Sequence, residues 1–176
     1  MFSGRAWASK AEIREFTLSN KHDYVYVGAK LEGAFTEGIR EAITSGIPTT
    51  FKYYLELVAP RHLWFDRKTN RKVLQYRVAY DTLKKEYEVT IDDGASSQVR
   101  VTKSEEEMRR WMTTIDSYRF LDSRKIQPVT RYKVRLKAEM KCIKMPFPLN
   151  FLLFYISFWD FDTPWVSSPI PRASHE

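Results

Sequence analysis

Residues 131–142 alternate without a break between charged side chains and apolar or tyrosine side chains. Because successive side chains of a β-strand point to opposite faces of a sheet, this pattern predicts a strand with one buried and one solvated face. Such strands are typical of antiparallel sheets, since parallel strands are usually covered on both faces. The predicted buried set is Tyr132, Val134, Leu136, Ala138, Met140 and Cys142.

Two short helices interrupt the strand patterns of the chain. Thr36 can cap the first helix by accepting a backbone hydrogen bond, and Gly46 suits the left-handed position that ends it. Ser104 and Glu107 form a capping box at the start of the second helix. Helical spacing places Ile39, Ala42 and Ile43 on the buried face of the first helix, and Met108, Trp111, Met112 and Ile115 on that of the second.

These elements predict an α+β fold. Besides the strand at 131–142, strand patterns occur at 12–18, 24–31, 47–58, 72–80, 86–91 and 98–102. With few long connections between them, we expect an antiparallel β-sandwich or half-barrel of about seven to eight strands with two short helices packed on it. A chain of 176 residues favours a single domain, which we place at residues 9–166, with a loose C-terminal tail at 167–176.

The N-terminus carries a pattern that signal peptidase prefers. Ala6 and Ala8 form a small-x-small motif, with Ser9 as the first residue of a mature protein. No apolar segment precedes the motif, so two interpretations stay open. Residues 1–8 are the remnant of a signal peptide, or Met1 is the natural start and the motif is a coincidence.

The net charge of +7 favours an anionic partner, with a basic solvated surface as the alternative. The alternating strand concentrates cations on its solvated face, where they can meet an acidic protein or an anionic membrane surface, or protect a sheet edge. Nucleic acid is the least favoured partner, because exposed aromatic side chains for base stacking do not alternate with these cations. The basic face comprises Arg131, Lys133, Arg135, Lys137 and Lys141.

The segment 146–159 is the main candidate for a binding surface. It is rich in aromatic and aliphatic residues but is too short to span a membrane. It is either a central core element or an exposed patch suited to a partner or a membrane interface. The candidate contact residues are Phe151, Phe154, Tyr155, Phe158 and Trp159, together with Trp64; Tyr24, Tyr26, Tyr53, Tyr54, Tyr76 and Trp64 either line a cavity or fill the sandwich.

The residues offer little support for catalysis. The single cysteine, Cys142, lies on the apolar side of its predicted strand, where a thiol acts as a small hydrophobe. His22, His62 and His175 have no carboxylate or cysteine at metal-ligand spacing, and no glycine-rich phosphate loop is present. We therefore predict no catalytic residue, no metal site and no cofactor.

Three ordered blocks carry a resemblance to a known family: residues 31–36 (LEGAFT), 42–51 (AITSGIPTTF) and 80–87 (YDTLKKEY). With these blocks the chain resembles, from about Ile13 to Trp165, the bacterial family filed as domain of unknown function 4390. The resemblance implies a small exported protein, usually made with a signal sequence, whose gene often lies near those of membrane sensor kinases of the nitrogen-regulation type. It implies no activity and no catalytic residue.

Together these observations predict a non-catalytic, exported binding module in the periplasm, linked to envelope sensing by a membrane sensor kinase. The alternative function is lipid or other apolar-ligand binding in an aromatic-lined cavity, and the alternative location is the cytoplasm. A pocket of several hundred Å³ lined by the aromatic residues would favour the apolar ligand. A filled interior with Phe151, Phe158 or Trp159 exposed would favour a protein partner.

Overall fold

The computed structural model describes residues 11–59, 67–126, 132–140 and 160–171, and all strand pairs in these ranges are antiparallel. The first sheet has the order β1 (Glu12–Lys21), β2 (Tyr24–Glu32), β7 (Thr114–Asp122). The second has the order β10 (Val166–Pro169), β8 (Lys133–Met140), β3 (Thr49–Ala59), β4 (Arg67–Asp81), β5 (Glu86–Asp92), β6 (Ser97–Thr102), with β9 (Phe161–Asp162) also beside β8. The predicted α+β class is confirmed.

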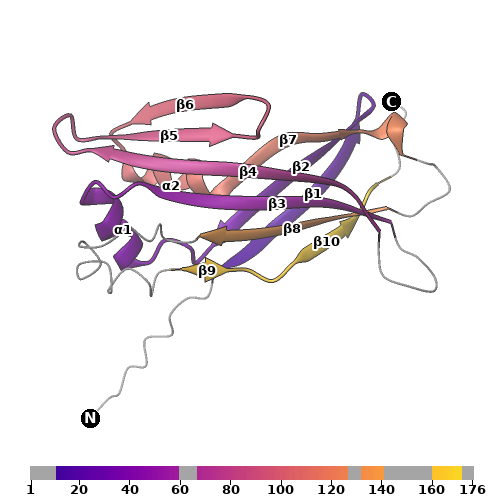
Figure 1. Cartoon of the computed structure of the whole chain (residues 1–176), viewed down its shortest axis with the longest axis horizontal. Coiled ribbons are helices and arrows are strands. Elements are labelled where there is room, and N and C mark those ends of the chain that lie inside the picture. Colours follow the sequence, from indigo (N-terminus) through magenta and orange to yellow (C-terminus); the bar gives the residue numbers. More distant parts are fainter. Residues whose placement is uncertain (1–10, 60–66, 127–131, 141–159, 172–176) are drawn as a thin grey trace, which may run out of the picture.

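The two sheets cross and share one hydrophobic core (Figure 1). Their inner faces are apolar because every second residue is aliphatic or aromatic in residues 25–31 of β2, 51–57 of β3, 74–80 of β4 and 134–140 of β8. The sheets meet where β1 lies against β10, and there the Asn20 side chain donates to the Pro171 carbonyl at 3.5 Å. The largest fully buried side chains include Phe51, Tyr53, Ile39, Ile43, Leu55, Leu74, Met108, Met112, Ile115, Leu136 and Met140.

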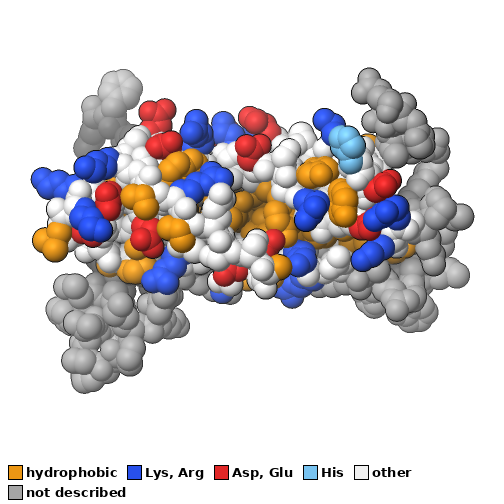
Figure 2. Space-filling view, turned by 90° about the horizontal axis from the view of Figure 1, so that it is seen from above, with side chains coloured by type: hydrophobic (Ala, Val, Ile, Leu, Met, Phe, Trp, Pro, Cys, Tyr) orange, Lys and Arg blue, Asp and Glu red, His pale blue; other side chains and the backbone are white. Residues whose placement is uncertain are grey.

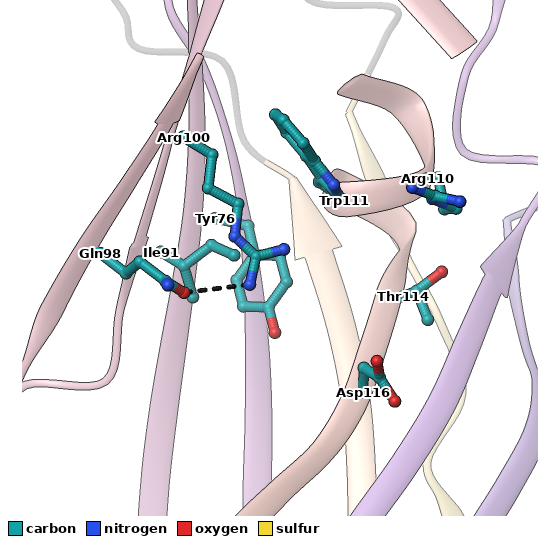
Figure 3. Close-up of a pocket in the computed structure, with 8 residues that line it drawn as sticks. All are labelled: Tyr76, Ile91, Gln98, Arg100, Arg110, Trp111, Thr114 and Asp116. Carbon is teal, nitrogen blue, oxygen red and sulfur yellow. Dashed lines mark hydrogen bonds between the residues drawn. The ribbon is translucent and has the colours of Figure 1, made fainter. Parts of the chain in front are cut away.

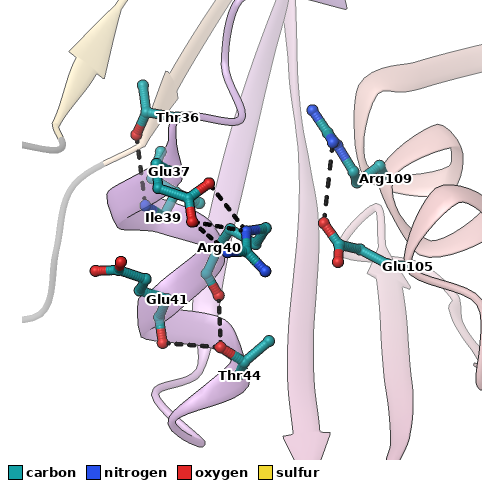
Figure 4. Close-up of polar contacts among 8 residues, drawn as sticks. All are labelled: Thr36, Glu37, Ile39, Arg40, Glu41, Thr44, Glu105 and Arg109. Carbon is teal, nitrogen blue, oxygen red and sulfur yellow. Dashed lines mark hydrogen bonds and ion pairs between the residues drawn. The ribbon is translucent and has the colours of Figure 1, made fainter.

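Helix α1 (Glu37–Thr44) packs on β3 and β4, and its predicted ends are confirmed. The Thr36 hydroxyl accepts from the Ile39 amide at 3.4 Å, and Gly46 has a φ of 84°. The Arg40 side chain donates to the Glu37 carboxylate, one turn earlier in the helix (Figure 4). The negative charge of Glu37 is also favourable at the positive N-terminal end of the helix. The helix is thus defined at both ends by local interactions.

Helix α2 (Glu105–Thr113) stands between the two sheets, in contact with β4, β5 and β6 on one side and with β2 and β7 on the other. The Ser104 hydroxyl accepts from the Glu107 amide at 3.2 Å, as predicted. The Glu107 carboxylate instead accepts from the Thr102 hydroxyl at 2.6 Å, which ties α2 to the end of β6. At the other end, the buried Tyr53 hydroxyl donates to the Met112 carbonyl at 2.7 Å and fixes α2 on β3.

Strand β7 is the main element that the sequence patterns do not predict. Its buried residues, Ile115 and Phe120, are five positions apart, so they do not follow the alternation of a regular strand. The break arises at Ser117, whose φ of 49° accompanies register shifts against β2 and marks a bulge. Ile115, expected on the second helix, therefore belongs to this strand.

The C-terminal boundary also differs from the prediction. We expected a loose tail from residue 167, but Ser167–Pro169 pair with Lys133–Arg135 as part of β10. Ile170 donates a further backbone hydrogen bond to Tyr132 at 3.2 Å, which extends this order beyond the strand. Residues 172–176 and the expected signal-peptide remnant at 1–8 lie outside the described residues.

The link between Tyr53 and α2 generates a stability prediction. Replacing Tyr53 by Phe leaves the buried Met112 carbonyl without its donor, and we expect the free energy of unfolding to fall by about 1–2 kcal/mol. Urea denaturation of the wild type and of Tyr53→Phe measures this change. The half-buried Tyr80 provides the control, since within the described residues its hydroxyl makes no hydrogen bond. An equal loss in Tyr80→Phe would contradict the interpretation.

Candidate binding groove

The sandwich has an open side between β6 and β7. Strand β6 pairs only with β5, and β7 pairs only with β2, so that each has one free edge in the described part of the chain. Between them the surface is hollowed, with apolar side chains exposed in the depression (Figure 2). We name the part beside α2 the Trp111 hollow; its volume is about 470 Å³, and it is lined by Tyr76, Ile91, Gln98, Arg100, Arg110, Trp111, Thr114 and Asp116.

Arg100 is the most ordered cation of the Trp111 hollow. Its guanidinium donates to the Gln98 side chain at 3.1 Å and lies 5.6 Å from the centre of the Trp111 ring. Gln98 and Arg100 come from the same face of β6, and Trp111 comes from α2 (Figure 3). Because these two contacts already orient the guanidinium, it loses less conformational freedom when it binds an anionic group.

Tyr76 lies deepest in the Trp111 hollow. Only 5% of the residue is exposed, and its ring packs edge-on against Tyr53 with 5.0 Å between the ring centroids. Burial raises the pKa of the Tyr76 hydroxyl to about 12, so that the group stays protonated at physiological pH. The hydroxyl points along the hollow (Figure 3), where it can donate a hydrogen bond to a ligand.

A second hollow follows the first along β7. We name it the Tyr24 hollow; its volume is about 550 Å³. Asp93, in the turn between β5 and β6, separates the two, because its carboxylate accepts from the Tyr118 hydroxyl of β7 at 3.2 Å. The residues that line the second hollow are Tyr24, Leu57, Asn70, Lys72, Asp93, Ala95, Tyr118, Arg119, Phe120, Leu121, Asp122, Lys125 and Ile126.

The Asp93 carboxylate also organises its own turn. It accepts from the backbone amides of Ala95 at 2.9 Å and Ser96 at 2.7 Å, in addition to the Tyr118 hydroxyl. These hydrogen bonds lower the pKa of Asp93 below its usual range, and the hydrogen bond from the Ala95 amide has the largest effect. Burial and the neighbouring Asp93 charge raise the pKa of Tyr118 to about 12. Both groups therefore keep, near neutral pH, the protonation states that this contact needs.

The lining of the two hollows includes the carboxylates of Asp93, Asp116 and Asp122. Histidine and cysteine are absent from the lining residues of both hollows. In the ranges that the structure covers, no three potential metal ligands lie together, and no helix has the length and apolarity needed to cross a membrane. Beside these carboxylates, the lining offers hydrogen-bond donors, cations and aromatic rings, which are suited to binding.

The predicted basic face is partly described, and two of its members are neutralised within the fold. Arg135 donates to Glu56 at 2.7 Å, and Lys137 lies 2.7 Å from a carboxylate oxygen of Asp162. Arg71 lies 4.0 Å from Glu56, whose side chain is 1% exposed, and the Arg135 guanidinium stacks over Trp165 at 4.8 Å. Lys133 is exposed, while Arg131 and Lys141 lie outside the described residues.

The predicted aromatic contact residues are outside the described ranges: Phe151, Phe154, Tyr155, Phe158, Trp159 and Trp64. The same holds for Cys142, His62 and His175, whereas His22 occupies the exposed turn between β1 and β2. Of the tyrosines considered for a cavity, Tyr76 lines the Trp111 hollow and Tyr24 lines the other. Tyr53 fills the core, and Tyr54 hydrogen-bonds to Glu139 on the outer face.

Sequence reasoning missed the groove residues Gln98, Arg100 and Asp116. The position of Trp111, between two buried methionines at helical spacing, indicated the core, but the side chain is only half-buried. The short strand at 98–102 has a cation between two valines that prove to be exposed. This was the one sequence feature that could have indicated an unusual strand at the edge of a sheet. Asp116 lies on the strand that the bulge concealed, so no periodic pattern could place it.

Comparison with known proteins identifies a family for this chain. The family model described as "Domain of unknown function (DUF4390)" matches residues 8–169, nearly the whole chain. No curated protein and no solved structure matches it.

The Glu56–Arg135 ion pair generates a prediction about the outer face. Replacing Arg135 by Leu removes the closest cation from a carboxylate that is almost fully buried. We expect a loss of about 2–3 kcal/mol in the free energy of unfolding, below the full cost for a buried pair because Arg135 is partly exposed. Lys133→Leu, on the same face of β8 but exposed, is the matched control. Urea denaturation should show that the control changes stability by less than about 0.5 kcal/mol.

The pKa of Asp93 generates a prediction about acid stability. Because this pKa is lower in the folded chain, the ionised carboxylate stabilises the fold fully above the unfolded value of about 3.9. That stabilisation is lost as the pH falls through the folded value. We expect the wild type to lose more stability than Asp93→Asn between about pH 4 and pH 2, as measured by denaturation at each pH. Parallel curves for the two proteins would contradict the role of Asp93.

Proposed function

Because this chain belongs to the family "Domain of unknown function (DUF4390)", whose description names no activity, we propose its function from the groove between β6 and β7. The protein is a non-catalytic binding module, and its ligand lies in the Trp111 hollow. The observation that carries this proposal is the arrangement of Arg100, Trp111 and Tyr76 around one open depression. A cation, an indole and a protonated phenol converge there without a catalytic partner.

The filled interior supports a ligand on the open side of the sandwich. The space between the sheets is occupied by Phe51, Tyr53 and Leu55, each with 1% or less of its surface exposed. Phe51 also packs against Phe35 and Phe161, with 5.3 Å and 5.1 Å between ring centroids. Phe51 and Tyr53 of β3 thus serve as core. The Trp111 hollow lies between β6 and β7, and the Tyr24 hollow is lined by β7 together with residues of β2, β3 and β4.

The composition of the hollow favours an acidic segment of a partner protein. Arginine, tryptophan and tyrosine are the residue types that contribute most binding energy at protein interfaces. Arg100, Arg110 and the single carboxylate of Asp116 line the Trp111 hollow, and Arg110 also lies 3.8 Å from a carboxylate oxygen of Glu107. The whole chain carries a charge of +7, which attracts an acidic partner before contact.

One observation favours a small amphipathic molecule as a second candidate ligand. The volume of about 470 Å³ is within the range of small-molecule sites. Such a ligand must carry an acidic group, because a purely apolar molecule would remove water from Arg100 without replacing its hydrogen bonds.

Export of the protein stays part of this proposal. It is supported by the small-x-small motif that ends at Ala8, and residues 1–10 lie outside the described residues. A periplasmic location would place the groove where it can bind the extracytoplasmic part of an envelope protein. The connection to a membrane sensor kinase rests on the family resemblance alone. Cell fractionation with N-terminal sequencing of the mature protein tests export directly, and a mature chain beginning at Ser9 is the expected result.

Substitution of the groove residues tests binding. Protein purified from its own host and analysed by native mass spectrometry is expected to carry a bound species that Arg100→Ala and Trp111→Ala each remove. At interfaces, losses at such residues are about 2 kcal/mol or more, which is roughly thirtyfold in affinity.

Leu83→Ala is the matched control for this experiment. Leu83 is 93% exposed in the turn between β4 and β5, and it does not line either hollow. Circular dichroism confirms that each variant is folded. A bound species that survives both groove substitutions, or that Leu83→Ala also removes, overturns the proposed site.

A further inference from the structure

Strand β6 has a free edge that is regular along its whole length. All six of its residues pair with β5 in unbroken register, and none has a positive φ. Its sequence, SQVRVT, contains no proline, and its one charged residue, Arg100, faces inward, a feature that natural sheets use against unspecific pairing at an edge. Its residues are exposed except for the half-buried Thr102. Strand β6 therefore presents a regular row of backbone groups to solvent.

Two other edges in the described structure are blunted. Strand β7 is bent by the bulge at Ser117 and starts directly at the end of α2. Strand β10 has four residues, of which the last is Pro169, which has no amide hydrogen. Among these three edges, β6 is thus the one that suits the addition of another strand.

The two faces of β6 differ in chemistry. Val99 and Val101 project from the outer face and are 57% and 54% exposed, among the most exposed large hydrophobic residues described. Gln98 and Arg100 project from the other face, toward the Trp111 hollow. A strand beside β6 would therefore place alternate side chains next to the valines and next to Arg100.

We propose that an extended segment of an acidic partner protein adds to β6 as a further antiparallel or parallel strand. This inference rests on the proposed function and specifies its ligand. Apolar β-branched side chains of the segment lie beside Val99 and Val101, and carboxylates at the intervening positions bind Arg100 and Arg110. The main-chain hydrogen bonds to β6 supply affinity, and the alternating side chains supply specificity.

Charge favours such a segment over a second copy of this chain. The antiparallel self-pairing that joins Val99 of one copy to Val101 of the other also sets the two Arg100 side chains directly opposite each other. Like charges in that position destabilise a sheet. Two copies that each carry a charge of +7 also repel one another at long range, whereas an acidic segment is attracted.

The test uses a capped peptide of alternating Val and Glu, six residues long, and the full protein. Binding is measured by NMR titration, and backbone hydrogen exchange is followed residue by residue. We expect at least tenfold slower exchange of the β6 amides that do not bond to β5, because the peptide backbone now accepts from them. We also expect affinity to fall as the salt concentration rises.

Two controls separate strand addition from other modes of binding. Arg100→Gln should weaken binding of the peptide at least tenfold. Arg109 is an exposed arginine of α2 that stacks over Phe35, and Arg109→Gln should leave the affinity for the peptide unchanged. A peptide of alternating Val and Lys should bind at least tenfold more weakly than the glutamate peptide. These results together support the proposal.

Other results overturn it in distinguishable ways. Binding that leaves the β6 amides unprotected, or a lysine peptide that binds equally well, refutes strand addition by an acidic segment. If neither peptide binds but the bound species found by native mass spectrometry still depends on Arg100 and Trp111, this inference fails and the proposed function stands. A dimer that Val101→Lys dissociates assigns the edge to a second copy of the chain instead.

Discussion

The position of helix α2 between the two sheets is the constraint on which the rest of the structure depends. Met108 and Met112 anchor it in the core, and the Tyr53 hydroxyl binds its last turn to β3. Strand β6 directly precedes the helix in the chain, and strand β7 directly follows it. Because α2 fills the space between them, the sandwich does not close on this side, and β6 and β7 retain free edges. The groove is thus a consequence of how the core is filled.

The charges of the chain divide between structural pairs and the groove. On the outer face, Arg135 and Lys137 form ion pairs with Glu56 and Asp162. These ion pairs neutralise part of the positive charge of the alternating strand. In the described part of the chain, Arg100 forms no ion pair with a carboxylate and is held by Gln98 and Trp111. Such neutral contacts orient a cation while leaving its charge available to a ligand. The binding site that we propose is therefore the groove, although the other face has the more conspicuous pattern of charge.

Prediction from the sequence succeeded where a local rule acts on a regular element. The caps at Thr36 and Ser104, the αL residue Gly46 and the inward alternation of β3, β4 and β8 all follow from such rules and are confirmed. It failed at β7, because the bulge at Ser117 shifts the pattern by one residue. The groove was missed for a related reason. Its residues come from β4, β5, β6, α2 and β7. The sequence patterns marked Tyr76 and Trp111 singly, but no linear pattern brings these five elements together.

The sequence by itself determined both helices, the strands with regular alternation, the antiparallel class of the sheets and the family to which the chain belongs. Periodicity and capping act over a few residues, so the chain carries this information locally. Only the tertiary structure decided which strands form the edges, which cations are paired and where the open side lies. These properties depend on which elements meet across the core, and side chains such as Tyr76, Arg100 and Asp116 become neighbours only when both sheets close around α2.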